Sequence, residues 1–350
     1  MIRKIALAAV LCGHIFSANA QDDVALNGSS YFLPRTALRF TLRIEKTRYK
    51  PRELSRYAER YFKKAASETE QTTYRILNIK MAPKGVPDAT KAFTAKIDDK
   101  HGISSLYKND EGILLAINTK PEQEENEPPF KPAPKPRKLN PYNYITQEMA
   151  GAENKAKMAS IVADEIFDIR NNRNRLIKGQ EGTNPISENQ FDIMMQELNT
   201  QEEALMQLFY GVSNIDTIET NIDYIPDHEV KHEVVFRFSK YYGLVRKNDL
   251  SGTPYYICIK DDHTIPAGSS TVPLTEKNKN DAGIWVNLPG KITAQLYREN
   301  ELLDTYEVYA GQFGRTEPMI GDLFVRKMAT KVVLDPTTGA TRSINVELRK

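Results

Sequence analysis

Hydrophobic and polar residues alternate along much of this chain with a period of two. Alternation of this kind is typical of strands that bury one face. Near the N-terminus it predicts strands at Ala37–Ile44, Thr72–Met81, Phe93–Ile97 and Gly112–Ile117. Glycine and proline punctuate strands, so Gly85-Val86-Pro87 is expected to end the second of them.

Between the first two strands the pattern becomes helical. Apolar residues recur at intervals of three and four from Leu54 to Ala65, which places them on one face of a helix. Lys50-Pro51 would open this helix, because proline at the first helical position gives up no hydrogen bond. We expect the apolar face to dock on a sheet, so that residues 21–119 form a small α+β domain.

Residues 120–141 differ in composition from their surroundings. The segment contains seven prolines, an acidic first half and a basic second half. Such a composition cannot build a packed core and favours an extended linker with polyproline character. The alternative is a docking peptide for the groove of a partner.

A helical pattern follows in residues 142–211. A first helix from Gln147 to Lys178 would be about 48 Å long. After a turn at Gly179–Pro185, Ser187 and Gln190 match the capping box that begins many helices. The segment therefore predicts a long αα-hairpin. The seam between its arms would use the small and apolar residues Met149, Ala152, Ala156, Ala159, Ala163 and Ile166.

The return arm of this hairpin carries two further signals. Thr200 and Glu203 form a second capping box, which predicts a kink near Asn199-Thr200. Gly211 stands where a terminal glycine commonly ends a helix.

The alternation returns in residues 212–350. Many short strands between frequent turns predict an antiparallel β-sandwich-like domain of about seven to nine strands. Glu299-Asn300-Glu301 is a polar break between two strands, and Asp335–Gly339 combines proline and glycine in a hairpin turn. Trp285, in the middle of a predicted strand, is expected in the core. The predicted fold class is thus α+β and mainly β.

Residues 1–20 have the pattern of a signal peptide. Arg3 and Lys4 precede the apolar run Ile5–Phe16, and the segment ends in small residues before Ala20. The run is shorter than the roughly 20 residues that a membrane-spanning helix needs. We therefore expect export without a transmembrane span, and cleavage would leave Cys258 as the single cysteine. Cys258 lies in an apolar strand and is expected to be buried.

The charge balance gives no indication of a polyanionic partner. The chain has 48 basic and 46 acidic residues, and removal of residues 1–20 leaves 46 of each. Nucleic acid is therefore not expected as a partner. An envelope protein or a glycan is the expected kind of partner.

One stretch matches a catalytic motif. His228-Glu229-Val230-Lys231-His232 has the H-E-x-x-H spacing of zinc peptidases, in which a helix brings both histidines to one metal ion. Here Pro226 precedes the motif and a β-branched run follows it, which predicts a strand. In a strand His228 and His232 would lie about 13 Å apart. The three residues stay candidate zinc ligands and base, and no other catalytic or cofactor-binding residue is indicated.

Seven segments between about Ser30 and the C-terminus form a recognisable set: Tyr31–Pro34, Lys50–Tyr61, Ile166–Arg173, Leu198–Leu205, Leu288–Gly290, Ala310–Arg315 and Asp335–Gly339. With these segments the chain resembles exported bacterial proteins of the domain-of-unknown-function family 4831. The resemblance implies a protein of a Gram-negative envelope and no known activity, and it transfers no functional residue. We would look for function first at Gln312-Phe313-Gly314-Arg315 and at the tip of the hairpin.

Three functions follow from these observations as hypotheses. The first is a non-enzymatic envelope protein, periplasmic or attached to the outer membrane or cell surface. Its projecting helical hairpin would bind or scaffold another protein. The second is a glycan-binding module that presents aromatic residues and arginines on an exposed face. The third is a zinc-dependent hydrolase at His228, Glu229 and His232.

Overall fold

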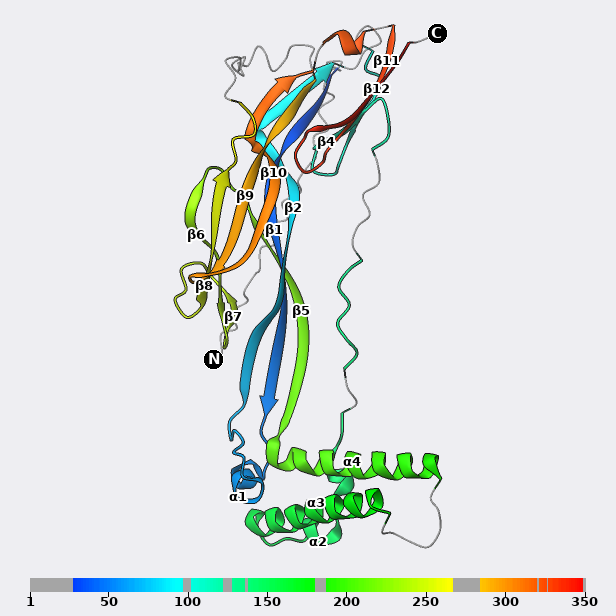
Figure 1. The fold of residues 1–350 in the computed structure, drawn as a ribbon, viewed down its shortest axis with the longest axis vertical. Helices are drawn as coiled ribbons and strands as arrows, with labels where there is room; N and C mark the ends of the chain where they lie inside the picture. The colour runs from blue at the N-terminus through cyan, green and yellow to red at the C-terminus, as the bar shows by residue number, and fades with distance from the viewer. Residues whose placement is uncertain are drawn as a thin grey trace, which may run out of the picture.

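The computed structural model describes residues 28–96, 102–121, 128–135, 138–179, 187–266, 284–319, 321–325 and 327–348. The predicted signal peptide, residues 1–20, lies outside them, as does the predicted turn after Gly179. Across the described residues the protein is mainly β, as predicted, and its named strands pair antiparallel. The molecule is elongated, with most of the strands toward one end and the helices at the other (Figure 1).

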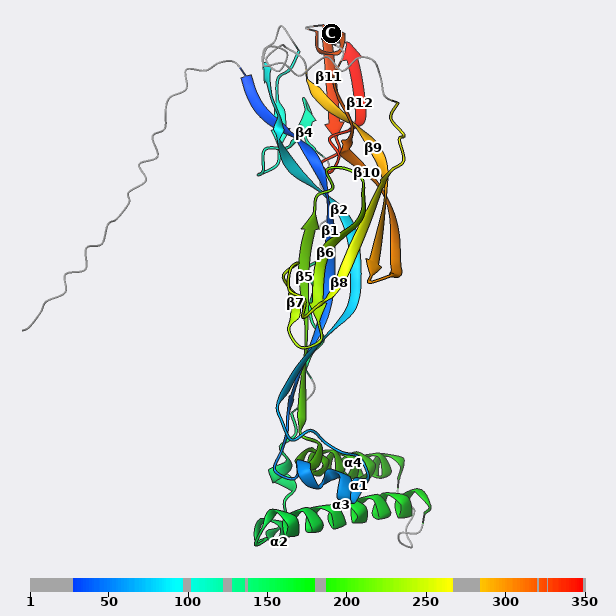
Figure 2. The ribbon, with the colours of Figure 1, turned by 90° about the vertical axis from the view of Figure 1, so that its left-hand side faces the viewer.

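A three-stranded sheet, here called the stalk, connects the two ends (Figures 1 and 2). β1 (Gly28–Lys50) lies at its centre, between β2 (Gln71–Lys96) and β5 (Val212–Tyr224). β1 pairs with β2 from Gly28 to Tyr49. The ladder hydrogen bonds of this pairing hold the chain extended over all of that length.

The break expected at Gly85-Val86-Pro87 is wrong, because β2 continues through it. β2 is the outer strand of the stalk, where a missing proline N–H costs no ladder hydrogen bond on the solvent side. Pro87 lies opposite Pro34, next to a register shift in β1. An irregular edge therefore accommodates residues that would interrupt a central strand.

A second, five-stranded sheet packs against the stalk, and the two form a half-barrel with one hydrophobic core. Leu38, Phe40 and Leu42 of β1 meet Phe236, Ile257 and Leu296 of the second sheet in that core. The sheet contains, in spatial order, β10 (Glu301–Pro318), β9 (Trp285–Arg298), β8 (Thr253–Asp261), β6 (Val230–Ser239) and β7 (Gly243–Val245).

A third sheet closes the far end of the molecule. It orders β12 (Thr341–Leu348), β11 (Met328–Leu334), β4 (Leu114–Ile117) and β3 (Leu106–Lys108), and the short 3₁₀ helix Gly321–Phe324 lies beside it. The second sheet, the part of the stalk that packs against it and this third sheet are together called the β end below.

Trp285 belongs to the core of the β end, as predicted. It is 4% exposed and stacks on Phe93 with ring centroids 5.4 Å apart. It is the first residue of β9 and does not lie in the middle of the strand, where it was expected. The predicted turn Asp335–Gly339 joins β11 to β12, and Gly339 has the positive φ of 75° that this turn requires.

Two of the sheets combine strands from distant parts of the chain. β1 pairs with β5, and β4 pairs with β11. Residues 21–119, expected as a domain of their own, thus contribute to sheets that residues 212–350 complete.

The helices form a compact group at the other end of the stalk, here called the helical head. Its helices are α1 (Ala58–Phe62), α2 (Gln147–Ala150), α3 (Lys155–Ile177) and α4 (Glu188–Tyr210), with 3₁₀ turns at Ser55–Tyr57 and Pro141–Tyr144. Ser187 and Gln190 form the predicted capping box of α4, and Gly211 ends that helix.

Three expectations for the helices are wrong. The apolar face that includes Leu54 and Ala58 packs against α3 and α4 instead of a sheet. The helix expected from Gln147 to Lys178 is divided, because Asn154 caps α3 separately from α2. α4 is one uninterrupted helix, within which the Thr200 hydroxyl donates to the Gln196 carbonyl at 2.7 Å.

The proline-rich segment runs beside the stalk. Its described parts are 120–121, 128–135 and 138–141, and they contain no helix or strand before the 3₁₀ turn that begins at Pro141. The Arg43 guanidinium lies 4.9 Å from the centre of the Phe130 ring, and Lys135 pairs with Asp216 of β5 at 2.5 Å. The segment therefore contacts the stalk while connecting the β end with the helical head.

Candidate functional site

The zinc motif lacks the geometry that its chemistry needs. His228 lies in a bend before β6, and His232 lies within β6, so the segment is not a helix. His232 is exposed and stacks on Tyr256, with ring centroids 3.7 Å apart. The Glu229 carboxylate accepts a hydrogen bond from the backbone N–H of Asp261 at 2.8 Å. The three candidate residues therefore do not converge on one point.

No metal site is assembled elsewhere in the part of the chain that the structure describes. Within that part, no three His, Cys, Asp or Glu side chains gather closely enough to hold a metal ion. Cys258 is half-buried, not fully buried as expected, because it points to the outer side of β8 while Ile257 and Ile259 face the core. No described helix is long and apolar enough to cross a membrane.

Aromatic residues gather on the helical head around Phe62. The Phe62 ring lies 5.0 Å from Phe209 and 5.7 Å from Phe167, measured between centroids. The Arg170 guanidinium lies over both Phe62 and Phe167, at 5.5 and 5.7 Å. A cation over aromatic faces is a stabilising contact, so Arg170 ties α3 to α1.

Arg170 and Arg173 of α3 also bind one carboxylate of α4. Their guanidinium nitrogens lie 2.6 and 2.5 Å from the two oxygens of Glu202. Burial opposes the charge on Glu202, but the hydrogen bonds from Arg170 and Arg173 outweigh it and lower the pKa of the carboxyl. These two ion pairs to one glutamate fix the long helices relative to each other.

Apolar side chains remain exposed on the outside of the helical head. Ile193 and Ile177 are 58% and 61% exposed, and Met194 and Phe167 are also exposed. An open depression of about 440 Å³ lies on the head, and its lining includes Tyr61, Phe62, Phe167, Arg170, Met206 and Tyr210. The head therefore presents mixed apolar and aromatic surface at one extremity of the molecule.

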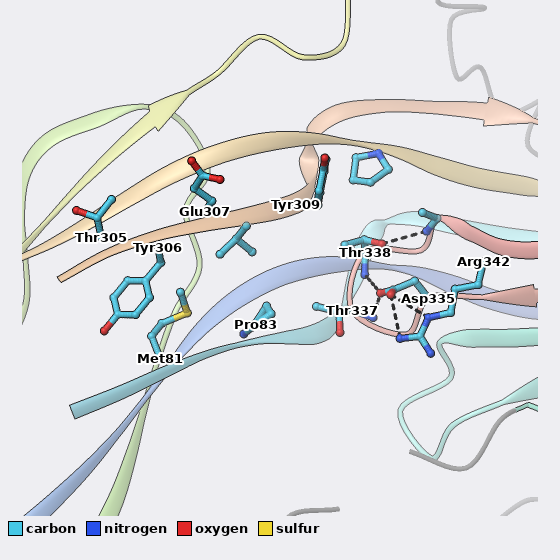
Figure 3. A pocket seen from close by; sticks show the side chains of 13 residues that line it. Met81, Pro83, Thr305, Tyr306, Glu307, Tyr309, Asp335, Thr337, Thr338 and Arg342 are labelled. Carbon is cyan, nitrogen blue, oxygen red and sulfur yellow. Dashed lines mark hydrogen bonds and ion pairs between the residues drawn. The ribbon is translucent and has the colours of Figure 1, made fainter. Parts of the chain in front are cut away.

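A larger groove lies on the β end, where the half-barrel is open (Figure 3). Its volume is about 830 Å³. β2 and β10, both outer strands of their sheets, form two of its walls, and the Asp335–Gly339 turn closes one end. The side chains that line it include Met81, Pro83, Thr305, Tyr306, Glu307, Tyr309, Thr338 and Arg342.

Charged, aromatic and apolar side chains together line this groove. Asp335 pairs with Arg342 at 3.0 Å and accepts hydrogen bonds from the backbone N–H groups of Thr337 and Thr338. Burial, together with a hydrogen bond to Asp304, raises the pKa of Tyr306, so its hydroxyl stays protonated and donates to that carboxylate. The groove thus offers hydrogen-bonding groups next to aromatic rings.

A junction of buried polar groups lies behind the groove. Asn287 is fully buried, and its amide nitrogen donates to the Pro34 and Thr338 carbonyls at 3.0 and 2.8 Å. The Gln312 side chain accepts from the N–H of Thr36 and donates to the Thr36 and Pro226 carbonyls, each at 2.9 Å. The Gln312–Arg315 connector, which the sequence suggested as a functional place, begins with a side chain that ties strands together.

The segments that carry the family resemblance lie in two places, the helical head and the junction around Asn287 and Gln312. Lys50–Tyr61, Ile166–Arg173 and Leu198–Leu205 contribute to the core and the ion pairs of the helical head. The others meet around Asn287 and Gln312. They are Tyr31–Pro34, Leu288–Gly290, Ala310–Arg315 and Asp335–Gly339.

These features define an elongated, mainly β protein with antiparallel sheets and a terminal group of helices. A family model described as "Domain of unknown function (DUF4831)" matches residues 27–342, and the chain belongs to this family. No curated protein and no solved structure matches the chain.

Sequence reasoning missed the groove. Tyr306, Glu307 and Tyr309 lie in the strand that follows the polar break at Glu299-Asn300-Glu301, and the position of this strand at a sheet edge depends on pairings that no local pattern encodes. The single local signal was the Asp335–Gly339 turn, which proved to be one wall of the groove.

Proposed function

We propose that this protein is a non-enzymatic component of the bacterial envelope, exported by its signal peptide, that binds another protein through its helical head. One observation carries the proposal: the helices are held at the far end of a long β stalk, away from most of the strands (Figure 1). A protein that needed only a stable fold would gain nothing from such a separation.

The surface of the head supports this proposal. Ile177 of α3 and Ile193 of α4 expose more than half of their side chains, and Phe167 is exposed beside a depression. Exposed apolar side chains next to aromatic residues and an arginine are typical of the centres of protein interfaces. The Arg170–Glu202–Arg173 contacts hold this surface in one arrangement, which lowers the entropy cost of binding.

The proposal is tested by photo-crosslinking of the full-length protein in cells, with mass spectrometry of the adducts. Crosslinkers placed at positions 177 and 193 are expected to capture the same protein. Ile193→Asp should abolish capture from position 177. Leu250→Asp is the matched control, since Leu250 is 84% exposed in a turn between β7 and β8. Equal capture by both variants would contradict the proposal.

The groove of the β end favours a glycan as a second candidate ligand. Tyr309 supplies a ring on which a sugar can stack, and Glu307, Asp335 and Arg342 supply hydrogen-bonding groups in the same groove (Figure 3). Binding to envelope, plant or host polysaccharides can be measured on a glycan array, with Tyr309→Ala as the variant that loses it. Silence across all of these glycans would contradict this second candidate.

A further inference from the structure

A lysine of the stalk reaches the polar junction behind the groove. The side-chain nitrogen of Lys91 lies 3.1 Å from the side-chain oxygen of Asn287 and 3.4 Å from the Gly311 carbonyl oxygen. Lys91 belongs to β2 and Asn287 to β9, so this contact joins the stalk to the second sheet. Within the described part of the chain, both hydrogen-bond partners of this amine are therefore neutral oxygens.

β2 is irregular at this lysine. It pairs with β1 on both sides of the segment Asp88–Lys91, but these four residues stand against the single residue Leu33 of β1. Asp88 is buried, and its carboxylate accepts hydrogen bonds from the backbone N–H and the hydroxyl of Thr90, at 2.9 and 2.6 Å. Bulges in sheets commonly re-aim a side chain next to a functional site. Here the side chain that the bulge places is that of Lys91.

The Asn287 amide is held in one orientation opposite the amine. It is fully buried, and its nitrogen donates to the Pro34 and Thr338 carbonyls. The Thr316 hydroxyl donates to its oxygen at 2.9 Å, where it would stabilise negative charge if an amine attacked the carbonyl carbon. Because a C=O bond is about 1.2 Å long, the Lys91 nitrogen lies no more than about 4.3 Å from that carbon. Rotation about the bonds of the flexible lysine side chain brings the two atoms into contact.

The surroundings of Lys91 favour its neutral form. Burial lowers the pKa of Lys91, and the nearby Arg35 cation acts in the same direction, whereas the Asp88 carboxylate opposes them. The neutral amine is the form that attacks a carbonyl carbon. Asp88 is the carboxylate whose charge acts on Lys91, so it is the candidate carrier for the proton that the amine loses.

We propose that Lys91 and Asn287 join in an intramolecular isopeptide bond, which links β2 covalently to β9. The Lys91 nitrogen attacks the side-chain carbonyl carbon of Asn287 and forms a bond to it, and the bond from that carbon to the amide nitrogen breaks. One proton of the amine passes to the departing nitrogen, with Asp88 as its carrier, and ammonia leaves. The atoms balance without an oxidant, a reductant or water. The bond lies at the β end, so its presence is independent of partner binding by the helical head.

The bond is tested by mass spectrometry of the purified, denatured chain without its signal peptide. The unmutated chain should fall short of its sequence mass by about 17 Da more than Lys91→Met does, which is the mass of ammonia. This comparison cancels ammonia lost elsewhere, for example by cyclisation of Gln21 if cleavage leaves it first. Lys84→Met, which changes another half-buried lysine of β2, is the matched control and should keep the deficit. Equal deficits in the unmutated chain and Lys91→Met would overturn the proposal.

Peptide mapping locates the bond in the unmutated chain and does not depend on the folding of a variant. Trypsin cleaves only after lysines with a free amine, so it should leave the chain uncut after Lys91. The digest should contain one branched peptide that joins the segment around Lys91 to the segment around Asn287. A digest in which both segments are found only as linear peptides would exclude the bond.

Asp88→Asn tests the carrier of the proton. The amide keeps an oxygen that can accept from Thr90, so circular dichroism should stay unchanged. Bond formation should slow by about a hundredfold, because the amide cannot take up the proton. Freshly synthesised Asp88→Asn should therefore yield little of the branched peptide. A yield equal to that of the unmutated chain would exclude Asp88 from the reaction.

Discussion

The β end and the helical head are held together by different kinds of contact. At the β end, backbone segments far apart in the sequence touch directly, and the amides of Asn287 and Gln312 join them. In the head, apolar side chains fill the space between α1, α3 and α4, and the ion pairs of Glu202 link the two long helices. The junction around Asn287 and Gln312 is therefore limited by backbone geometry, whereas the head is limited by side-chain volume.

The largest effect is expected from Gly314→Ala at the β end. A Cβ atom on Gly314 would lie 1.7 Å from the Leu288 carbonyl oxygen, and backbone cannot move aside as a side chain can. We expect a loss of about 4 kcal/mol or more in the free energy of unfolding, measured in urea. Gly151→Ala, whose nearest neighbour would be 3.2 Å away, is the control and should cost far less. Similar losses for the two variants would contradict a backbone limit at this junction.

Phe209→Ala should be the most damaging single truncation in the head. Phe209 is fully buried and touches Phe62 and Tyr61 through its ring. Loss of a buried phenyl group costs about 3–5 kcal/mol. The helical circular-dichroism signal should melt earlier, while the fluorescence of Trp285, the single tryptophan, follows the β end unchanged. A parallel shift of both signals would show that the two ends unfold as one unit.

Glu202→Gln tests the charged contact between the long helices and should have an intermediate effect. Hydrogen bonds to a charged group contribute about 1–3 kcal/mol, and the amide keeps the shape but not the charge. The pKa of Glu202 is lowered in the folded protein, so its stabilisation is present above the ordinary value of 4.5 and is lost as the pH falls through the lower folded value.

The pH dependence of head melting supplies the measurement for this variant. The stability of the head should fall on acidification below pH 4.5 in the unmutated chain, and Glu202→Gln should flatten that decrease. Glu203→Gln, on the next residue of α4, is the control and should keep the decrease. An equally steep acid decrease in both variants would show that Arg170 and Arg173 do not stabilise the ionised Glu202.

Lys135→Ala should have the smallest effect. Lys135 pairs with Asp216 between the proline-rich segment and β5, and its side chain is 71% exposed. Water and salt screen such pairs, so thermal unfolding should not shift measurably. A shift of several degrees would show that the proline-rich segment is a structural part of the stalk and not only a connection.

Local sequence patterns predicted helices, strands and turns better than they predicted which of these pack against one another. Alternation found strands, the capping box at Ser187 found the start of α4, and the Asp335–Gly339 turn found the last hairpin. The apolar face around Leu54 was also found, but its partner is the pair of long helices and not a sheet. Periodicity shows that a face is buried, and it does not show which surface covers it.

The candidate sites escaped the sequence for the same reason. The groove takes its side chains from β2, β10 and the last turn, which come together only through long-range pairing. The motif at His228 shows the converse case. Its residues match the sequence of a helical zinc site, but Val230–Ser239 forms a strand. A motif carries chemistry only in the secondary structure that aims its side chains.

The long register between β1 and β2 also has a mechanical consequence. The chain runs out to the head in β1, returns in β2, runs out again in the proline-rich segment and returns in β5. Because β1, β2 and β5 each span the stalk, tension between the helical head and the β end would be carried by three extended covalent backbones, which the ladder hydrogen bonds hold in register. The stalk therefore resists stretching along its axis and would transmit a pull on the helical head to the β end.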